Sequence, residues 1–134
     1  MAVLRDELIG LRSMDDIIKA RQLVRECAIF QGLSLVDQTK IVTAASELAR
    51  NTLVHGGGGE MRLQALNDGP RRGVKVIFVD SGPGIPDIEL AMKDGYTTRG
   101  GLGLGLSGSK RLVDEFGIDS KPGKGTTVSI VRWR

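Results

Sequence analysis

The sequence predicts an α+β fold, with helices packed on one face of a mostly antiparallel sheet. Two long segments before residue 57 repeat apolar residues at helical spacing, whereas three later segments are short and strand-like. No internal repeat, low-complexity stretch or linker interrupts the 134 residues. We therefore expect a single domain, residues 1–134, large enough to bury a hydrophobic core.

The first half of the chain predicts an edge strand followed by two helices. The candidate strand covers residues 3–11. Each helix should begin at a serine followed three residues later by an aspartate, which is an N-cap pattern. These starts are Ser13 with Asp16 and Ser34 with Asp37. The first helix should end near Gly32 and the second at the glycines 56–59, because glycine favours helix termination.

The second half predicts strands separated by turns and shorter helices. The strands are expected at 61–65, 74–79 and 126–133. A short helix is expected at 87–93 and a longer one over about 104–116. The buried stripe of the longer helix would consist of Leu106, Leu112, Val113 and Phe116.

Composition argues against several classes of function. The net charge of +3 is small, and three Phe, one Tyr and one Trp offer few surfaces for stacking on bases, so we expect no nucleic-acid binding. Arg5, Asp6 and Glu7 argue against a signal peptide, and no apolar run reaches the roughly 20 residues that span a bilayer, so we expect no membrane association. With a single cysteine, Cys27, no internal disulfide can form, which favours a cytoplasmic protein.

A glycine-rich run at residues 100–106, Gly-Gly-Leu-Gly-Leu-Gly-Leu, is the strongest functional signal. Alternating glycine and leucine suits neither a helix nor a strand, but it suits a loop whose backbone amides approach a phosphate and then open a helix. Nearby donors and cations favour that interpretation. They are Thr97, Thr98, Arg99 and Lys110.

Two other phosphate motifs match this region in part. Gly103-x-Gly105-x-x-Gly108 has the spacing of the dinucleotide fingerprint, but no strand is expected immediately before it. The segment 103–110 resembles a P-loop, except that Ser109 stands where the lysine is required. The run alone therefore does not choose between these sites and an ATP lid.

Three polar residues elsewhere are candidates for the same site. Glu47 and Asn51 are four residues apart on the second helix and so share a face, where they could support Mg²⁺ with an adjacent base or simply be solvated. Asp80 ends an apolar strand and needs a hydrogen-bond donor. That donor could be an adenine amine, or the backbone amides of Gly82 or Gly84 in a turn.

The order of these motifs resembles the GHKL, or Bergerat-fold, ATP-binding superfamily, which includes gyrase, Hsp90, histidine kinases and MutL. The matching motifs are Glu47-x-x-x-Asn51, Asp80-x-Gly82-x-Gly84, Gly101-Leu-Gly103-Leu-Gly105-Leu106 and Gly125-Thr126. The resemblance implies a two-layer α/β sandwich that holds ATP between its helices and a lid at about residues 94–102.

The resemblance also implies a role for each matching residue. Glu47 would be the base for the substrate hydroxyl, and Asn51 would bind Mg²⁺. Asp80 would bind the adenine amine, with Thr126 helping through water. Two glycines would let the chain pass closely by the base, and the lid run would bind the phosphates through backbone amides. These residues are Gly82 and Gly84, and Gly101, Leu102, Gly103, Leu104, Gly105 and Leu106.

Nearly the full length resembles the small serine/threonine kinases of bacterial stressosomes. The segments that carry this resemblance are 20–23, 46–51, 80–88, 92–98 and 111–116. It implies ATP-dependent phosphorylation of STAS-domain antagonist proteins, and a partner switch that activates a downstream serine phosphatase or another output protein. Two alternatives are an anti-sigma-factor kinase that binds a sigma factor, and a nucleotide-dependent binding module with little kinase activity.

Overall fold

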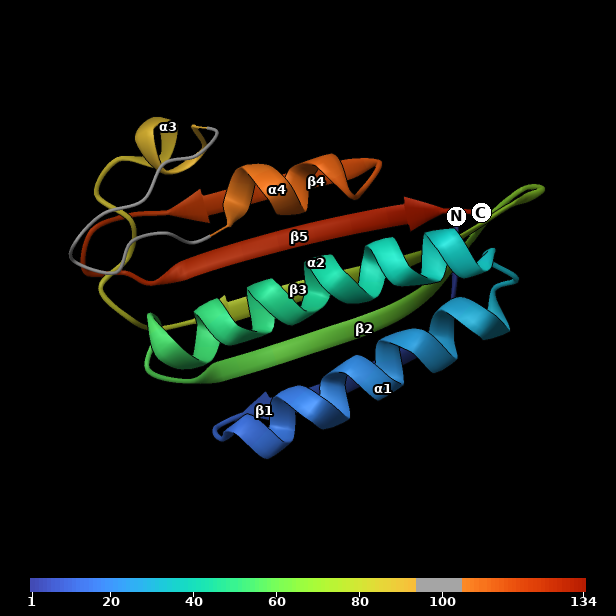
Figure 1. Cartoon of the computed structure of the whole chain (residues 1–134), viewed down its shortest axis with the longest axis horizontal. Coiled ribbons are helices and arrows are strands. Elements are labelled where there is room, and N and C mark those ends of the chain that lie inside the picture. Colours follow the sequence, from blue (N-terminus) through green and yellow to red (C-terminus); the bar gives the residue numbers. More distant parts are fainter. Residues whose placement is uncertain (94–104) are drawn as a thin grey trace.

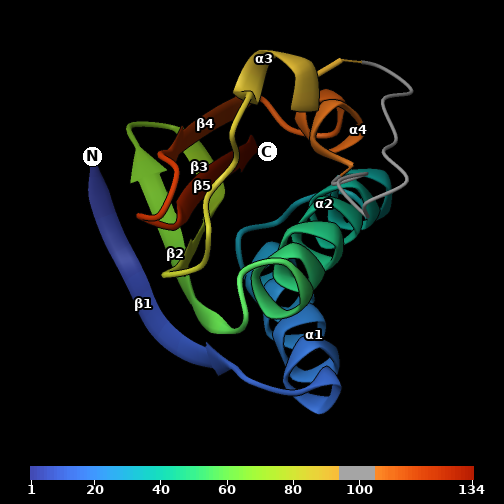
Figure 2. The ribbon, with the colours of Figure 1, turned by 90° about the vertical axis from the view of Figure 1, so that its left-hand side faces the viewer.

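A computed structural model describes residues 1–93 and 105–134 of the chain. In this part, five strands form one sheet and two long helices cover one of its faces (Figures 1 and 2). The strands are β1 (Ala2–Leu11), β2 (Gly59–Asp68), β3 (Arg71–Asp80), β4 (Glu115–Ser120) and β5 (Thr126–Trp133). The helices are α1 (Met14–Phe30), α2 (Leu35–Val54), α3 (Ile88–Ala91) and α4 (Leu106–Arg111). The predicted α+β class is confirmed.

The sheet is antiparallel throughout, in the order β1-β2-β3-β5-β4. β3 lies at its centre, and its apolar residues Val74, Val76 and Phe78 are buried. At the end of β3, Asp80 pairs with Gly59 of β2 on one side and with Thr126 of β5 on the other. This register brings the predicted adenine ligands Asp80 and Thr126 side by side.

The predicted starts of both long helices are confirmed. The Ser13 hydroxyl accepts a hydrogen bond from the Asp16 amide, and the Ser34 hydroxyl accepts one from the Asp37 amide. Each serine therefore satisfies a backbone donor that has no partner inside the helix. The predicted edge strand is also confirmed, as β1.

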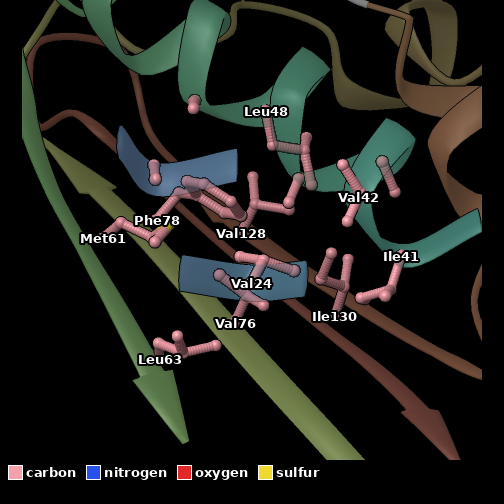
Figure 3. Packing of buried hydrophobic residues seen from close by; sticks show 14 of the residues in the cluster. Val24, Ile41, Val42, Leu48, Met61, Leu63, Val76, Phe78, Val128 and Ile130 are labelled. Atoms are coloured by element: carbon pink, nitrogen blue, oxygen red, sulfur yellow. The ribbon is translucent and has the colours of Figure 1, made fainter. Parts of the chain in front are cut away.

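The core lies between α1, α2 and the inner face of the sheet. Val24 of α1 and Leu48 of α2 point toward Val76, Phe78 and Val128 of the two central strands (Figure 3). All five side chains are at most 5% exposed. Burial of this apolar area is the main favourable contribution to folding, and it holds α2 against β3 and β5.

The expectation of a helix over about 104–116 is wrong at its C-terminal end. α4 ends at Arg111, and Glu115–Ser120 form the edge strand β4, which pairs with β5. The spacing of Phe116 is compatible with the predicted helix. Phe116 and Ile118 also alternate with exposed residues, which is the pattern of a strand. Pairing with β5 satisfies the backbone of this segment, so the strand prevails over the helical spacing. The short helix predicted at 87–93 is confirmed over 88–91.

Candidate nucleotide site

A cavity of about 140 Å³ lies where β3 ends and β5 begins, and residues from the C-terminal part of α2 line it. Its polar lining includes Asn51, Asp80 and Thr126, which the sequence analysis predicted. Two further predicted residues, Gly84 and Leu106, also line it. The fold thus brings five of the predicted residues, from positions 51 to 126, around one space.

Asp80 makes one of the two contacts that the sequence left open, and it also lines the cavity. Its Oδ1 atom accepts a hydrogen bond of 2.9 Å from the amide of Gly82, so the carboxylate does cap the following turn. The same side chain also lines the cavity and is only half-buried. A carboxylate held in this way keeps a fixed orientation while still offering acceptor capacity to a ligand.

Glycines allow close backbone packing around Asp80. A Cβ at Gly56, just after α2, would overlap the Asp80 side chain, and a Cβ at Gly82 would lie 2.8 Å from the Gly56 carbonyl oxygen. Gly84 has a φ of +76°, and a Cβ there would overlap the Lys121 carbonyl oxygen. Gly82 and Gly84 are therefore glycines because neighbouring backbone segments approach them closely, whether or not a ligand is present.

Ser120 is a site residue that the sequence analysis missed. Its hydroxyl lies 2.7 Å from the Thr126 hydroxyl and donates to the Gly125 carbonyl oxygen at 3.1 Å. It also accepts a 2.8 Å hydrogen bond from the amide of Ile85, which lines the cavity. Ser120 therefore links the Asp80–Ile85 loop to Thr126 and fixes the direction of the Thr126 hydroxyl. No motif marked it, because its position depends on the unpredicted strand β4.

The apolar walls of the cavity were also missed. They come from both layers of the fold, and their alternation in sequence predicted core positions rather than a binding site. The wall residues are Leu48, Thr52, Phe78, Pro83, Ile85 and Val128, with His55 and Gly56 at the end of α2. A concave space with mostly apolar walls and a few polar groups is typical of a small-molecule site.

Glu47 lines a different space. It is half-buried and faces a cleft of about 670 Å³ between α1, α2 and α4, whereas Asn51, one helical turn further on, lines the smaller cavity. The start of α4 borders both spaces, because Leu106 lines the cavity and Gly105 lines the cleft. Gly105 has a φ of +63° and packs directly against the Glu47 side chain.

Four residues of the predicted lid run lie outside the part of the chain that the structure describes. These are Gly101, Leu102, Gly103 and Leu104. Of the last two residues of the run, Gly105 lies against Glu47 and lines the cleft, and Leu106 lines the cavity. Within residues 1–93 and 105–134, no group of three or more His, Cys, Asp or Glu side chains could hold a metal ion. None of the helices in these ranges is long and apolar enough to cross a membrane.

Comparison with known proteins identifies the class to which this fold and site belong. Residues 36–134 match the family of histidine kinase-, DNA gyrase B- and HSP90-like ATPases, so the chain belongs to that family. The predicted membership of the GHKL superfamily is confirmed.

Relatives of known identity narrow this assignment. The chain is 48% identical to the serine/threonine-protein kinase RsbT of Bacillus subtilis (strain 168), over 88% of this chain and 89% of that protein. It is 33% identical to the anti-sigma F factor of Thermoanaerobacter sp. (strain X514), over 85% of this chain and 82% of that protein. The predicted resemblance to small serine/threonine kinases is thereby confirmed.

Solved structures with lower identity share the fold. A Mycobacterium tuberculosis protein with RsbU and RsbW domains superposes with a TM-score of 0.63 at 22% identity. The matched region covers 97% of this chain and 33% of the other chain. The histidine kinase domain of Erythrobacter litoralis EL346 superposes with a TM-score of 0.52 at 18% identity, over 87% of this chain and 59% of that one.

Proposed function

We propose that this protein is a Mg·ATP-dependent serine/threonine protein kinase that also acts as a partner-switching regulator. The observation that carries the proposal is the placement of Asn51 and Glu47 on consecutive turns of α2. Asn51 lines the smaller cavity, and Glu47 lines the more open cleft beside it. The 48% identity to RsbT supports the same assignment.

The cavity suits the adenine base of ATP. Asp80 would accept a hydrogen bond from the exocyclic amine, and Thr126, oriented by Ser120, would bind a ring nitrogen through water. Phe78, Ile85 and other apolar walls would cover the faces of the ring. These assignments follow the chemistry of the lining, because the polar atoms converge on a space that is otherwise apolar.

The phosphates would extend from this cavity toward Glu47, past the start of α4. Backbone amides of the lid run, including those of Gly105 and Leu106, would bind them. Asn51 would hold Mg²⁺, which takes few protein ligands because phosphates and water supply the others. When bound, Mg²⁺ neutralises part of the phosphate charge. A site with one amide ligand agrees with the lack of an acidic cluster among the described residues.

Glu47 would act as the base. The hydroxyl oxygen of the substrate attacks the γ-phosphorus, the bond to the bridging oxygen breaks, ADP leaves, and the hydroxyl proton passes to the Glu47 carboxylate. The base must reach the acceptor while the nucleotide is in place. Glu47 meets this condition because it faces a cleft that the nucleotide cavity does not occupy.

We infer that the substrates are STAS-domain antagonist proteins, and that release from them allows binding to a downstream serine phosphatase or another output protein. RsbT and an anti-sigma F factor are both among the relatives, which supports a regulator that exchanges protein partners. The 33% identity to the anti-sigma F factor makes a sigma-factor-binding kinase the second candidate.

The test is a phosphotransfer assay with γ-labelled ATP, Mg²⁺ and STAS-domain proteins encoded in the same genome. We expect label on a serine or threonine of a STAS protein, and loss of this label with Glu47→Gln, which preserves the size of the side chain. Glu60→Gln is the matched control, because Glu60 is exposed on β2. Tight ATP binding without transfer would favour the binding module, and co-purification of a sigma factor would favour the anti-sigma kinase.

A further inference from the structure

The cleft beside Glu47 is much larger than one carboxylate requires. It has a volume of about 670 Å³ and is lined by the first half of α1, the middle of α2, and α4 with the residues that flank it. The proposed reaction uses Glu47 and the start of α4 and leaves the rest of this surface without a role. The nucleotide cavity lies on the other side of the α4 start, so both spaces can be filled at once.

The floor of the cleft is apolar, and its edge is exposed to solvent. Ile17 of α1 is buried and Leu112, just after α4, is half-buried, and both line the cleft. Met14, at the first turn of α1, lines its edge and is 58% exposed. A flexible, exposed methionine beside a buried isoleucine offers a place for an apolar side chain of a partner.

The rim of the cleft is positively charged. Arg21, Arg50 and Arg111 line it, and Glu47 is the single acidic residue among the lining residues that the structure describes. Arg21 and Arg50 are exposed on α1 and α2. A neighbouring hollow of about 180 Å³ is lined by Arg21 and also by Arg25, so the positive surface continues along α1.

We propose that this cleft binds the segment of the protein substrate that carries the acceptor hydroxyl, and that this segment is acidic with an apolar side chain near the acceptor. The inference rests on the proposed kinase function, since it takes Glu47 as the base at one end of the cleft. The arginine rim complements carboxylates, which steers and orients the approaching partner. The apolar floor of the cleft holds the apolar side chain of the substrate, and the acceptor hydroxyl is then presented to Glu47.

Charge reversal at two rim positions tests the proposal. Arg21→Glu and Arg50→Glu should each lower kcat/KM for the STAS-domain substrate at least tenfold, mainly through a higher KM, while ATP affinity changes less than twofold. For the unmodified protein, KM should rise steeply with salt concentration, because charge complementarity between exposed groups is screened. Met14→Ser should raise KM without altering its salt dependence.

The matched control is Arg72→Glu, which makes the same charge change at an exposed position of β3 outside the cleft. If both rim variants transfer phosphate as efficiently as Arg72→Glu, the cleft is not the docking site. If the unmodified protein transfers no phosphate, the proposed function fails instead. In that case the affinity of the STAS protein is measured directly for Arg21→Glu, Arg50→Glu and Arg72→Glu. Equal affinities of these three variants would overturn the docking proposal.

Discussion

Gly105 and Glu47 are in direct contact, although they lie 58 positions apart in the chain. A Cβ built on Gly105 would come within 2.8 Å of both Cγ and Oε1 of Glu47, closer than such atoms normally approach. Gly105 also has a φ of +63°, in the left-handed region that other residues rarely adopt. The N-cap residue of α4 must therefore be glycine for two independent reasons, one of which is the position of the proposed base.

Gly105→Ala should displace Glu47 and strain the start of α4 by about 1–2 kcal/mol. We expect at least a tenfold loss of kcat in the phosphotransfer assay. Gly10→Ala in β1 is the control, because Gly10 lines neither the cavity nor the cleft and a Cβ there meets no atom within 4 Å. It should preserve activity and raise stability by up to about 1 kcal/mol, because glycine inside a strand is less favourable than alanine. Full activity of Gly105→Ala would show that the position of Glu47 is not critical.

Asp80→Asn should remove nucleotide binding and leave the fold intact. The asparagine carbonyl oxygen can still accept the hydrogen bond from Gly82, which preserves the turn. Its NH₂ group would then replace an acceptor in the cavity and face the donor of the adenine amine. We expect ATP affinity to fall by at least tenfold, about 1.4 kcal/mol or more, measured by titration calorimetry.

Asp119→Asn provides the control, since Asp119 is an exposed residue of β4. Both variants should unfold at nearly the same temperature as the unmodified protein when nucleotide is absent. Unchanged ATP affinity in Asp80→Asn would mean that the cavity beside Asp80 does not bind the adenine base.

Much of this site follows from local sequence patterns. Local patterns marked Asp80, Glu47 and Asn51 as candidates but left structural alternatives open for each. Their roles in the site were implied by the resemblance to the GHKL superfamily. Ser13 and Ser34 marked the helix starts, since N-capping depends on residues three positions apart. The two helix starts are confirmed because each depends on neighbours in the chain, whereas the roles of Asp80, Glu47 and Asn51 stay predictions.

The rest of the site depends on contacts between distant segments. Ser120 reaches Thr126 only because β4 pairs with β5, and the segment that forms β4 also satisfied helical spacing. The separation of Glu47 from the cavity beside Asp80 depends on where α4 packs against α2. Local spacing says nothing about that packing, so the sequence predicted one site where the structure has a cavity and an adjoining cleft.

The ion pair between Asp37 and Arg132 should make stability sensitive to acid. It joins the start of α2 to β5 at 2.7 Å, and the Asp37 side chain is 24% exposed. The hydrogen bond from Arg132 holds the pKa of Asp37 below its ordinary value of 3.8. A depressed pKa means that the stabilisation is complete above pH 3.8 and is lost as the pH falls through the folded-state value.

Asp37→Asn should therefore lower the free energy of unfolding at pH 7 by about 1 kcal/mol or less, which is measured as a lower melting temperature. The difference from the unmodified protein should shrink below about pH 4, the ordinary range of an aspartate. Asp6→Asn is the control: Arg62 also lowers the pKa of Asp6, but the two side chains of this pair are 39% and 53% exposed. A pH-independent difference for Asp37→Asn would assign its effect to something other than the ion pair.

Gln31 should contribute strongly to stability from a position outside the site. It is fully buried at the end of α1, and its Nε2 donates to the carbonyl oxygens of Leu66 at 2.7 Å and Gly73 at 2.9 Å. Gln31→Met keeps the volume but removes both donors, so we expect a loss of about 1–3 kcal/mol in urea unfolding. Gln22→Met, at an exposed position of α1, should change stability by less than about 0.5 kcal/mol. Equal stability of the two variants would show that the hydrogen bonds from Gln31 do not hold α1 to the β2–β3 hairpin.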